Sequence, residues 1–272
     1  MHQRNSFVRA LTTLAVVFIS TSVVHADSFG SGANQFNIDF VTIPGSANDG
    51  YGGQSAGINF TTPNIDHDYR IGVYEITNDQ WTKFEAELGV LVTGSPSYAY
   101  DENPLWTGTN APTNKVSWYE AAQFVNWLNT SAGHQPAYKF TGTQGTSAYT
   151  LDTWSPSQAD NGTNLYRHKD AFYYLPTEDE WVKAGYWNGS ALQTYSNASP
   201  GDLVSGEPDP AKWNYSTSSE NDPPWDVGSG VTELNGTFDM MGNVSEWLES
   251  PRSDGDYEAG SSRGKRGGSY FN

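Results

Sequence analysis

Cysteine is absent from all 272 residues of this sequence. The chain can therefore form no disulfide, offer no catalytic thiol and provide no thiolate ligand for a metal ion. Its stability has to come from a packed core, helped only by ligands that do not need sulfur, such as a hard cation bound through oxygen atoms. Chemistry that depends on the chain's own thiols is excluded.

Basic residues are scarce. Only 14 Lys and Arg stand against 31 Asp and Glu, and the formal net charge is −17 at pH 7. A surface this acidic repels nucleic-acid phosphates and anionic lipid headgroups. Nucleic acid is therefore excluded as a partner, whereas soluble cations and neutral ligands remain open. Solubility alone would also be a sufficient reason for the acidity.

The sequence has one marked apolar run, Leu14–Ile19, close to the N-terminus. It follows Arg4 and Arg9 and precedes Val24-His25-Ala26, a pattern that predicts a secretory signal peptide over residues 1–26. The run is far shorter than the roughly 20 residues that span a bilayer. We therefore predict an exported protein, which is periplasmic, secreted or at the cell surface, with no transmembrane segment in this chain.

Cleavage after Ala26 would leave 246 residues (272 minus 26), enough for one domain with a sizeable core. Residues 27–38 are rich in Gly, Ser and Asn, which predicts a flexible leader before a domain over 39–272. Aromatic residues make up 14% of the sequence, while the mean hydropathy of −0.61 marks most of the remainder as polar. We expect a loop-rich domain whose loops are held by aromatic side chains.

Three capping boxes predict where helices begin. Thr77, Ser117 and Thr177 are each followed three residues later by Gln or Glu, and then by apolar residues at helical spacing. Each cap contributes about 1 kcal/mol and fixes a helix start, so we interpret these Gln and Glu side chains as structural. Strands are predicted at 40–43 and 70–76, a hairpin at 138–151, and long loops at 89–115 and 187–235.

A turn near the C-terminus places two carboxylates close together. Gly242-Asn243 favours positive φ, and Asp239 and Glu246 flank the bend. The carboxylates and the carbonyl groups freed at the turn could surround a hard cation such as calcium, which takes about six to eight oxygen ligands. The spacing of these residues also has a simpler interpretation, a turn that leads into a strand and leaves Glu246 in solvent.

This stretch resembles the formylglycine-generating enzyme family, also called sulfatase-modifying-factor domains. The hallmark of the family is Gly-Asn-Val-Trp-Glu-Trp followed by Arg-Gly-Gly-Ser-Trp or -Tyr, and here Ser245 replaces the first Trp. Other blocks of the family are matched in order, at Tyr69–Asn78, Val116–Ala121, Tyr174–Trp181 and Arg266–Tyr270. The resemblance implies an α+β fold of an elaborated C-type-lectin-like kind, with little regular secondary structure and long ordered loops.

The resemblance also implies calcium ligands. In the hallmark block they would be the side chains of Asp239 and Glu246 and the carbonyl oxygens of Gly242 and Val244, which would hold a structural calcium ion. A second calcium site of the family would begin at Asn214-Tyr215, but its downstream ligand segment has no clear counterpart in this sequence.

Copper is not expected. The family's enzymes oxidise a substrate cysteine with oxygen, using copper held by two of their own cysteines, and the first would stand at Asn272. An amide oxygen is a poor substitute for the soft thiolate that Cu(I) selects. The resemblance also implies that the domain continues beyond the Arg-Gly-Gly-Ser-Tyr block, so we expect it to be incomplete at its C-terminus.

Other catalytic sets are poorly supported. His67, His134 and His168 lie in separate predicted loops without the spacing of a zinc site. A nucleophile elbow, a P-loop and a dinucleotide fingerprint are absent from the sequence. Carboxylate pairs for glycoside hydrolysis stay open, because 31 acidic residues offer many combinations.

Two classes of function remain. The first is a non-catalytic binding module whose aromatic and polar loops recognise an extracellular or periplasmic ligand, such as a glycan, a peptide or an envelope component. The alternative is a formylglycine-generating oxidase, or another diverged enzyme, with site residues beyond Asn272. The lack of cysteine favours the binding module.

Overall fold

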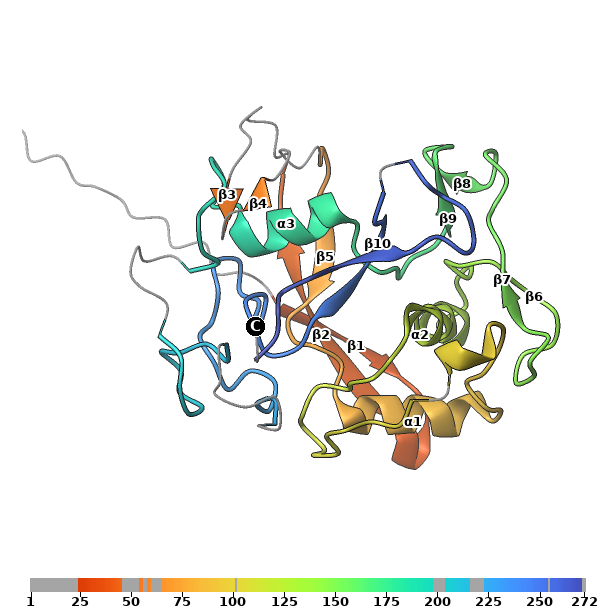
Figure 1. The fold of residues 1–272 in the computed structure, drawn as a ribbon, viewed down its shortest axis with the longest axis horizontal. Helices are drawn as coiled ribbons and strands as arrows, with labels where there is room; N and C mark the ends of the chain where they lie inside the picture. Colours follow the sequence, from red (N-terminus) through yellow and green to blue (C-terminus); the bar gives the residue numbers. More distant parts are fainter. Residues whose placement is uncertain are drawn as a thin grey trace, which may run out of the picture.

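The computed structural model describes residues 24–45, 54–55, 58–59, 65–100, 102–197, 204–215, 223–253 and 255–270. In these ranges three α-helices and a set of short strands are joined by long ordered coil (Figure 1). The helices are α1 (Asn78–Leu88), α2 (Trp118–Ser131) and α3 (Glu178–Tyr186). The strands are β1 (Val24–Phe29), β2 (Phe36–Ile43), β3 (Gln54–Ser55), β4 (Ile58–Asn59), β5 (Tyr69–Gly72), β6 (Phe140–Thr141), β7 (Thr150–Leu151), β8 (Ala159–Asp160), β9 (Asn164–His168), β10 (Glu246–Pro251) and β11 (Arg263–Arg266).

Strand β2 lies in the middle of a three-stranded antiparallel sheet, between β1 and β5. Its side chains alternate between two hydrophobic cores, as the two-residue period of a strand requires. Phe36 and Ile38 belong to the core that includes α1 and α2, whereas Val41 and Ile43 belong to the core that includes α3. In Figure 1 α3 accordingly lies at the top of the view, and α1 and α2 lie at the lower right.

The prediction of a flexible leader over residues 27–38 is wrong. β1 pairs with β2 along its whole length, and Phe29 is only 3% exposed. The Asp27 carboxylate accepts hydrogen bonds from Arg70 (2.6 Å, Nη2 to Oδ2) and from the Tyr173 hydroxyl (2.8 Å). The small residues that suggested flexibility form the short turn between the two strands. The prediction from composition therefore failed, because strand pairing orders this edge of the sheet.

Two sequence predictions fall partly or wholly outside the described residues. Only the last three residues of the predicted signal peptide, Val24–Ala26, are described, and they belong to β1. Asn272, where the family's first copper-ligating cysteine would stand, is not among the described residues. In the described part of the chain, none of the helices has the length and apolar character that a membrane crossing requires.

The three predicted helix starts are confirmed. Thr77, Ser117 and Thr177 are the N-caps of α1, α2 and α3, and in each box the cap hydroxyl accepts from the third helical amide. The side-chain oxygen of the third helical residue in turn accepts a hydrogen bond from the backbone amide of the cap residue, so both orphan donors are satisfied. α1 ends at Leu88 and is capped by Gly89, whose φ of 70° lies in the left-handed region that favours glycine.

The hairpin predicted at 138–151 is also confirmed, because β6 pairs with β7 inside it. Where described, the long stretches 89–115 and 187–235 are coil with a short 3-10 turn at Ser97–Ala99 and isolated bridges such as Ser95 with Thr150. The strand predicted at 70–76 is shorter than expected and ends at Gly72. The chain leaves the sheet there, and residue 75 reaches the C-terminal turn instead.

Candidate functional site

The Gly242-Asn243 turn adopts the backbone conformation that its sequence predicts. Asp239, Gly242 and Asn243 have φ values of 62°, 108° and 53°. At Gly242 a side chain would also collide, because a Cβ there would lie 2.2 Å from the Asn214 carbonyl oxygen. Positive φ and close backbone approach together explain why glycine occupies this position.

Asn243 joins the turn to distant parts of the chain. Its side chain is fully buried, its Oδ1 accepts from the Trp225 amide (2.8 Å), and its Nδ2 donates to Glu75 Oε2 (2.6 Å). Glu75 Oε1 accepts from the Val244 amide (3.0 Å), so one carboxylate caps the turn from 168 residues earlier. Sequence reasoning missed this role, for which the only signal was the position of Glu75 inside the matched block Tyr69–Asn78.

Four carboxylates lie around this turn, of which Glu233 and Asp239 are buried and Glu75 and Glu246 are partly buried, and loss of solvent raises the pKa of each. The pKa of Glu246 rises to about 8, that of Glu233 to about 7 and that of Asp239 to about 6, while that of Glu75 is raised well above its ordinary value. Neighbouring carboxylates add to the effect of burial at Glu75, Glu233 and Glu246. Among the described residues none of the four forms a salt bridge with Lys or Arg. The surplus negative charge would be relieved by a bound cation.

Asp239 and Glu246, the two predicted carboxylate ligands, are held by different neighbours. Asp239 is 6% exposed and its Oδ2 accepts from the Gly228 amide (3.2 Å). Glu246 Oε2 accepts from the Trp181 indole nitrogen, which fixes the carboxylate against α3. Both side chains are therefore positioned by the fold, and each keeps a second oxygen for another partner.

Two of the predicted ligand oxygens lie near Gly267. A Cβ at Gly267 would lie 3.4 Å from the Val244 carbonyl oxygen and 3.9 Å from Glu246 Oε2, the oxygen that accepts from Trp181. Within the described ranges, no three His, Cys, Asp or Glu are grouped so that they could hold a metal ion. Calcium here would depend on backbone carbonyls, as in the predicted ligand set. Asn214, at the second predicted site, has a buried Oδ1 without a hydrogen-bond partner in the described part of the chain.

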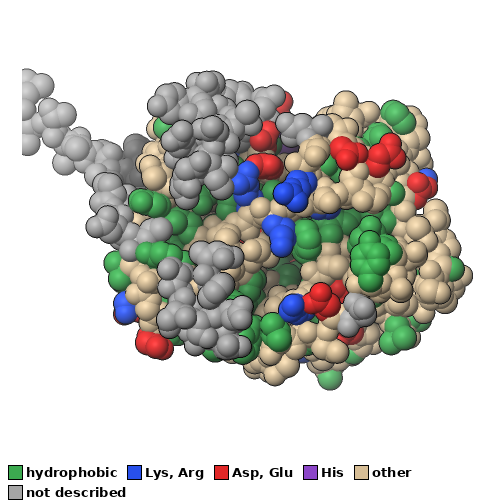
Figure 2. All heavy atoms as spheres, viewed as in Figure 1, with side chains coloured by type: hydrophobic (Ala, Val, Ile, Leu, Met, Phe, Trp, Pro, Cys, Tyr) green, Lys and Arg blue, Asp and Glu red, His purple; other side chains and the backbone are tan. Residues whose placement is uncertain are grey.

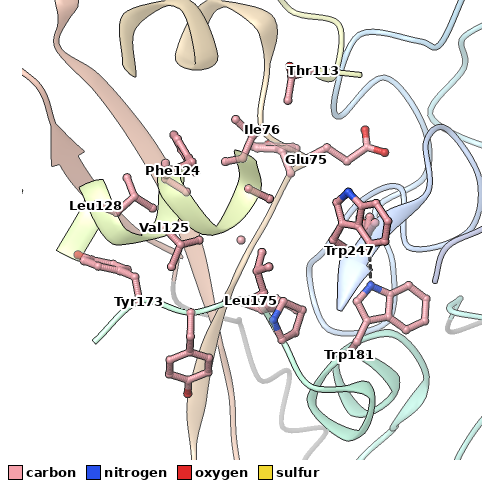
Figure 3. A pocket seen from close by; sticks show the side chains of 18 of the residues that line it. Glu75, Ile76, Thr113, Phe124, Val125, Leu128, Tyr173, Leu175, Trp181 and Trp247 are labelled. Atoms are coloured by element: carbon pink, nitrogen blue, oxygen red, sulfur yellow. Dashed lines mark hydrogen bonds between the residues drawn. The ribbon is translucent and has the colours of Figure 1, made fainter. Parts of the chain in front are cut away.

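A half-open cavity of about 730 Å³ lies beside the turn. Figure 3 shows Phe124, Val125 and Leu128 of α2 on one side of it and Trp181 and Trp247 on the other. Aromatic side chains make up about a third of the lining: Phe40, Tyr69, Tyr74, Trp81, Phe124, Phe172, Tyr173, Tyr174, Trp181, Phe238 and Trp247. Sequence reasoning predicted aromatic loops but not this cavity, because its lining comes from segments far apart in the chain.

Cations also line the cavity, although the chain has few of them. Figure 2 shows hydrophobic side chains at the base of a hollow, with Lys and Arg side chains around it. Lys265 lies over the Trp247 ring (5.2 Å to its centroid), and Lys115 pairs with Glu102 (3.0 Å). The Arg70 guanidinium lies over two aromatic rings of the lining. The lining holds Arg70, Lys115 and Lys265 together with Asp68, Glu75 and Glu246, so it is less acidic than the protein as a whole.

The histidines are spread over separate aromatic contacts. His67 has a side chain that is 55% exposed, whereas His134 stacks on Phe172 with ring centroids 4.6 Å apart. His168 packs edge-on against Trp154 and its side chain is only 11% exposed. The structure gives no support to a histidine metal site within the described residues.

Comparison with known proteins resolves the family. The model of a family described as the sulfatase-modifying factor enzyme 1-like domain matches residues 32–272. The chain belongs to this family. The resemblance read from the sequence blocks and the predicted α+β fold class are thereby confirmed.

Similar proteins carry various names. The chain is 28% identical over 199 residues to a protein of Paenibacillus barcinonensis called chaperone protein LppX. That match covers 66% of this chain and 61% of the other, so it spans less than two thirds of that protein. Treponema denticola variable protein 1 is similar in structure (TM-score 0.58, 21% identity, 92% of this chain and 88% of that one). CarF is similar as well (TM-score 0.56, 22% identity, 86% and 87%).

Ser245 is where this member of the sulfatase-modifying-factor family departs from the hallmark. Ser245 lines the cavity, is exposed, and its Oγ donates to the Gly268 carbonyl oxygen (2.7 Å). The hallmark Trp at this position would carry a much larger side chain into the same wall.

We propose that the turn binds one structural calcium ion through Asp239, Gly242, Val244 and Glu246. Calcium in hundredfold excess over its dissociation constant is expected to stabilise the fold by about 2.7 kcal/mol, because it binds only the folded state. Calorimetry with calcium and with chelator measures the shift in Tm. Glu246→Gln should abolish it, whereas Glu207→Gln, at an exposed carboxylate, should leave it intact. A calcium-dependent shift that survives Glu246→Gln would exclude Glu246 as a ligand.

Proposed function

We propose that this chain is an exported binding protein without formylglycine-generating activity, and that its partner binds in the aromatic cavity. The cavity carries the proposal, because it is large, half open and lined mainly by aromatic and aliphatic side chains. Such pockets obtain affinity from apolar burial and specificity from a few polar groups. Export is supported by the basic lead and the apolar run before Ala26.

The partner class that we propose is a polypeptide segment that presents apolar side chains. The lining offers many aromatic faces to such side chains, and Lys115 and Lys265 can meet acidic groups that flank them. The similarity to a protein named as a chaperone supports the same class. Phosphate-rich partners are disfavoured, because the net charge of the chain is −17.

Ser245→Trp tests where the partner binds. Restoring the family's bulky residue should fill the cavity and weaken the binding of reduced and alkylated α-lactalbumin, an unfolded protein, by about tenfold or more. Fluorescence anisotropy with the labelled client measures the change. Ser253→Trp, at an exposed position outside the lining, is the matched control and should bind like the wild type. Equal binding by all three proteins would overturn the assignment of the cavity, and no binding by the wild type would overturn the polypeptide class.

A second assay tests the lack of oxidase activity. Purified protein is incubated with copper, oxygen and a sulfatase-derived peptide that contains the target cysteine, and mass spectrometry monitors the thiol. No aldehyde is expected above a control without protein, because no side chain of this chain is a thiolate that could hold Cu(I). Aldehyde formation would require an oxidase site built without cysteine and would overturn the proposal.

A further inference from the structure

The predicted cleavage site lies in the middle of a strand. Val24, His25 and Ala26 pair with Val41, Phe40 and Asp39 of β2, while residues 27–29 pair with residues 38–36. Cleavage after Ala26 would remove the first half of β1 and leave the second half in place. On its other side β2 stays paired with β5 from Phe40 to Ile43. Cleavage would thus turn part of a central strand into an edge strand.

The two halves of β1 are held differently. Behind the cleavage site, Asp27 is bonded to Arg70 and Tyr173, and Phe29 lies in the core with its ring 5.2 Å from that of Tyr173. The three residues before the site are exposed, and Val24 is 51% exposed. The half that cleavage retains is therefore anchored by side chains, whereas the half that it removes contributes mainly backbone pairing.

The strand edge that cleavage would uncover borders the aromatic cavity. Phe40, the partner of His25 in the sheet, lines the cavity, and its ring centroid lies 5.9 Å from that of Tyr173. The Arg70 guanidinium lies 4.9 Å from the Phe40 ring centroid and 5.6 Å from that of Phe172. A side chain that takes the place of His25 would lie next to these groups, at the border of the site proposed for the partner.

We propose that cleavage after Ala26 uncovers the β2 edge at Asp39–Val41, and that an extended segment of a partner polypeptide adds there as a replacement strand. An uncovered edge presents unpaired amide and carbonyl groups, and an extended backbone can pair with them in register. Residues 24–26 already show the geometry, because they occupy this edge in the uncleaved chain. A glycan or a lipid has no repeating amide and carbonyl groups with which to complete the ladder.

This inference rests on the proposed function, since it requires export and cleavage, and it adds how the partner's backbone is held. Mass spectrometry of the exported protein first establishes whether the mature chain begins at Asp27. A mature chain that still carries Val24–Ala26 would overturn the inference, whatever the Ser245→Trp experiment shows. The matched control is the same protein exported behind a different leader, so that Thr21–Ala26 stays attached.

Hydrogen exchange tests the uncovered edge directly. In the mature protein, the amides of Asp39–Val41 that face β1 should exchange at least about tenfold faster than in the control that keeps Thr21–Ala26. The amides of Phe40–Ile43 that face β5 should be unchanged and serve as the internal reference. Equal protection in the two proteins would overturn the proposal.

Strand addition is then tested with an acetylated peptide of the sequence Thr-Ser-Val-Val-His-Ala, which copies residues 21–26. The peptide should slow exchange of the same amides in the mature protein, and should bind the control that keeps its own strand at least about tenfold more weakly. A second peptide carries methyl groups on the alternate backbone nitrogens that would donate to β2. It should bind the mature protein at least about tenfold more weakly than the unmethylated peptide. Equal binding of both peptides, or of one peptide to both proteins, would overturn strand addition. The cavity assignment would still stand or fall on Ser245→Trp.

Discussion

Arg167→Met is expected to destabilise the protein by about 3–5 kcal/mol, the cost of leaving buried charges without their partner. Arg167 is 8% exposed and lies among three carboxylates: Asp160 (2.8 Å), Glu180 (3.4 Å) and Glu249 (3.4 Å). Glu180 and Glu249 are 2% and 0% exposed, so water cannot replace the guanidinium. The Tyr174 ring, 3.9 Å from the guanidinium carbon, would also lose its cation.

Thermal unfolding measures this effect, and a decrease in Tm of roughly 10 °C or more is expected for a domain of this size. Lys169→Ala is the neighbouring control, because its pair with Asp170 is exposed and should contribute less than about 1 kcal/mol.

The loss of stability caused by Arg167→Met should grow as the pH rises. Burial raises the pKa of Glu249 to about 7 even beside Arg167, and without that cation the carboxyl would retain its proton more strongly. A penalty no larger than that of Lys169→Ala would contradict this account.

Glu233 is expected to make the protein less stable as the pH rises. Burial raises its pKa to about 7 from an ordinary value of 4.5, although bonds from the Ser196 hydroxyl (2.7 Å) and the Met240 amide (3.0 Å) oppose the rise. The folded state therefore holds a proton that the unfolded state releases between these two values. This proton stabilises the folded state by about 3 kcal/mol. The stabilisation is fully present below pH 4.5 and is lost as the pH rises through 7.

Glu233→Gln removes this titration. In chelator, the free energy of unfolding of the wild type should fall relative to that of Glu233→Gln by up to about 3 kcal/mol between pH 4.5 and pH 8. Denaturant titrations across this range measure the difference. Glu207→Gln, at an exposed carboxylate, should give a curve parallel to the wild type. Parallel curves for wild type and Glu233→Gln would show that Glu233 does not titrate in this window.

Local signals predicted the local structure. The caps at Thr77, Ser117 and Thr177 are complete within four residues each, and all three helices begin where these boxes predict. The family blocks likewise predicted the fold class, because their order along the chain can be read without knowing any contact. Composition failed at residues 27–38, where strand pairing with β2 and the bond from Arg70 to Asp27, 43 residues away, determine the structure.

The candidate site was only partly predictable for the same reason. Asp239, Gly242 and Glu246 belong to one short motif and could be named together. Glu75 and Glu233, the other two carboxylates of this group, come from segments that carry no motif for this role, and only the folded chain brings their charges to the same turn. The cavity could not be predicted either, because β2, α2, α3 and the hallmark block each supply part of its wall.

The Glu75 cap also affects how a chain that emerges N-terminus first can fold. Glu75 is out of the ribosome or the translocation pore long before Asn243 and Val244, which follow 168 and 169 residues later. Until they arrive, β1, β2 and β5 can pair, but the turn that completes the site cannot be capped. Contacts between such distant residues close slowly, since loop entropy must be overcome first. The core that includes α3 therefore stays incomplete until Met240 and Leu248 have emerged, and a partly folded chain with exposed apolar surface is prone to aggregation in that interval.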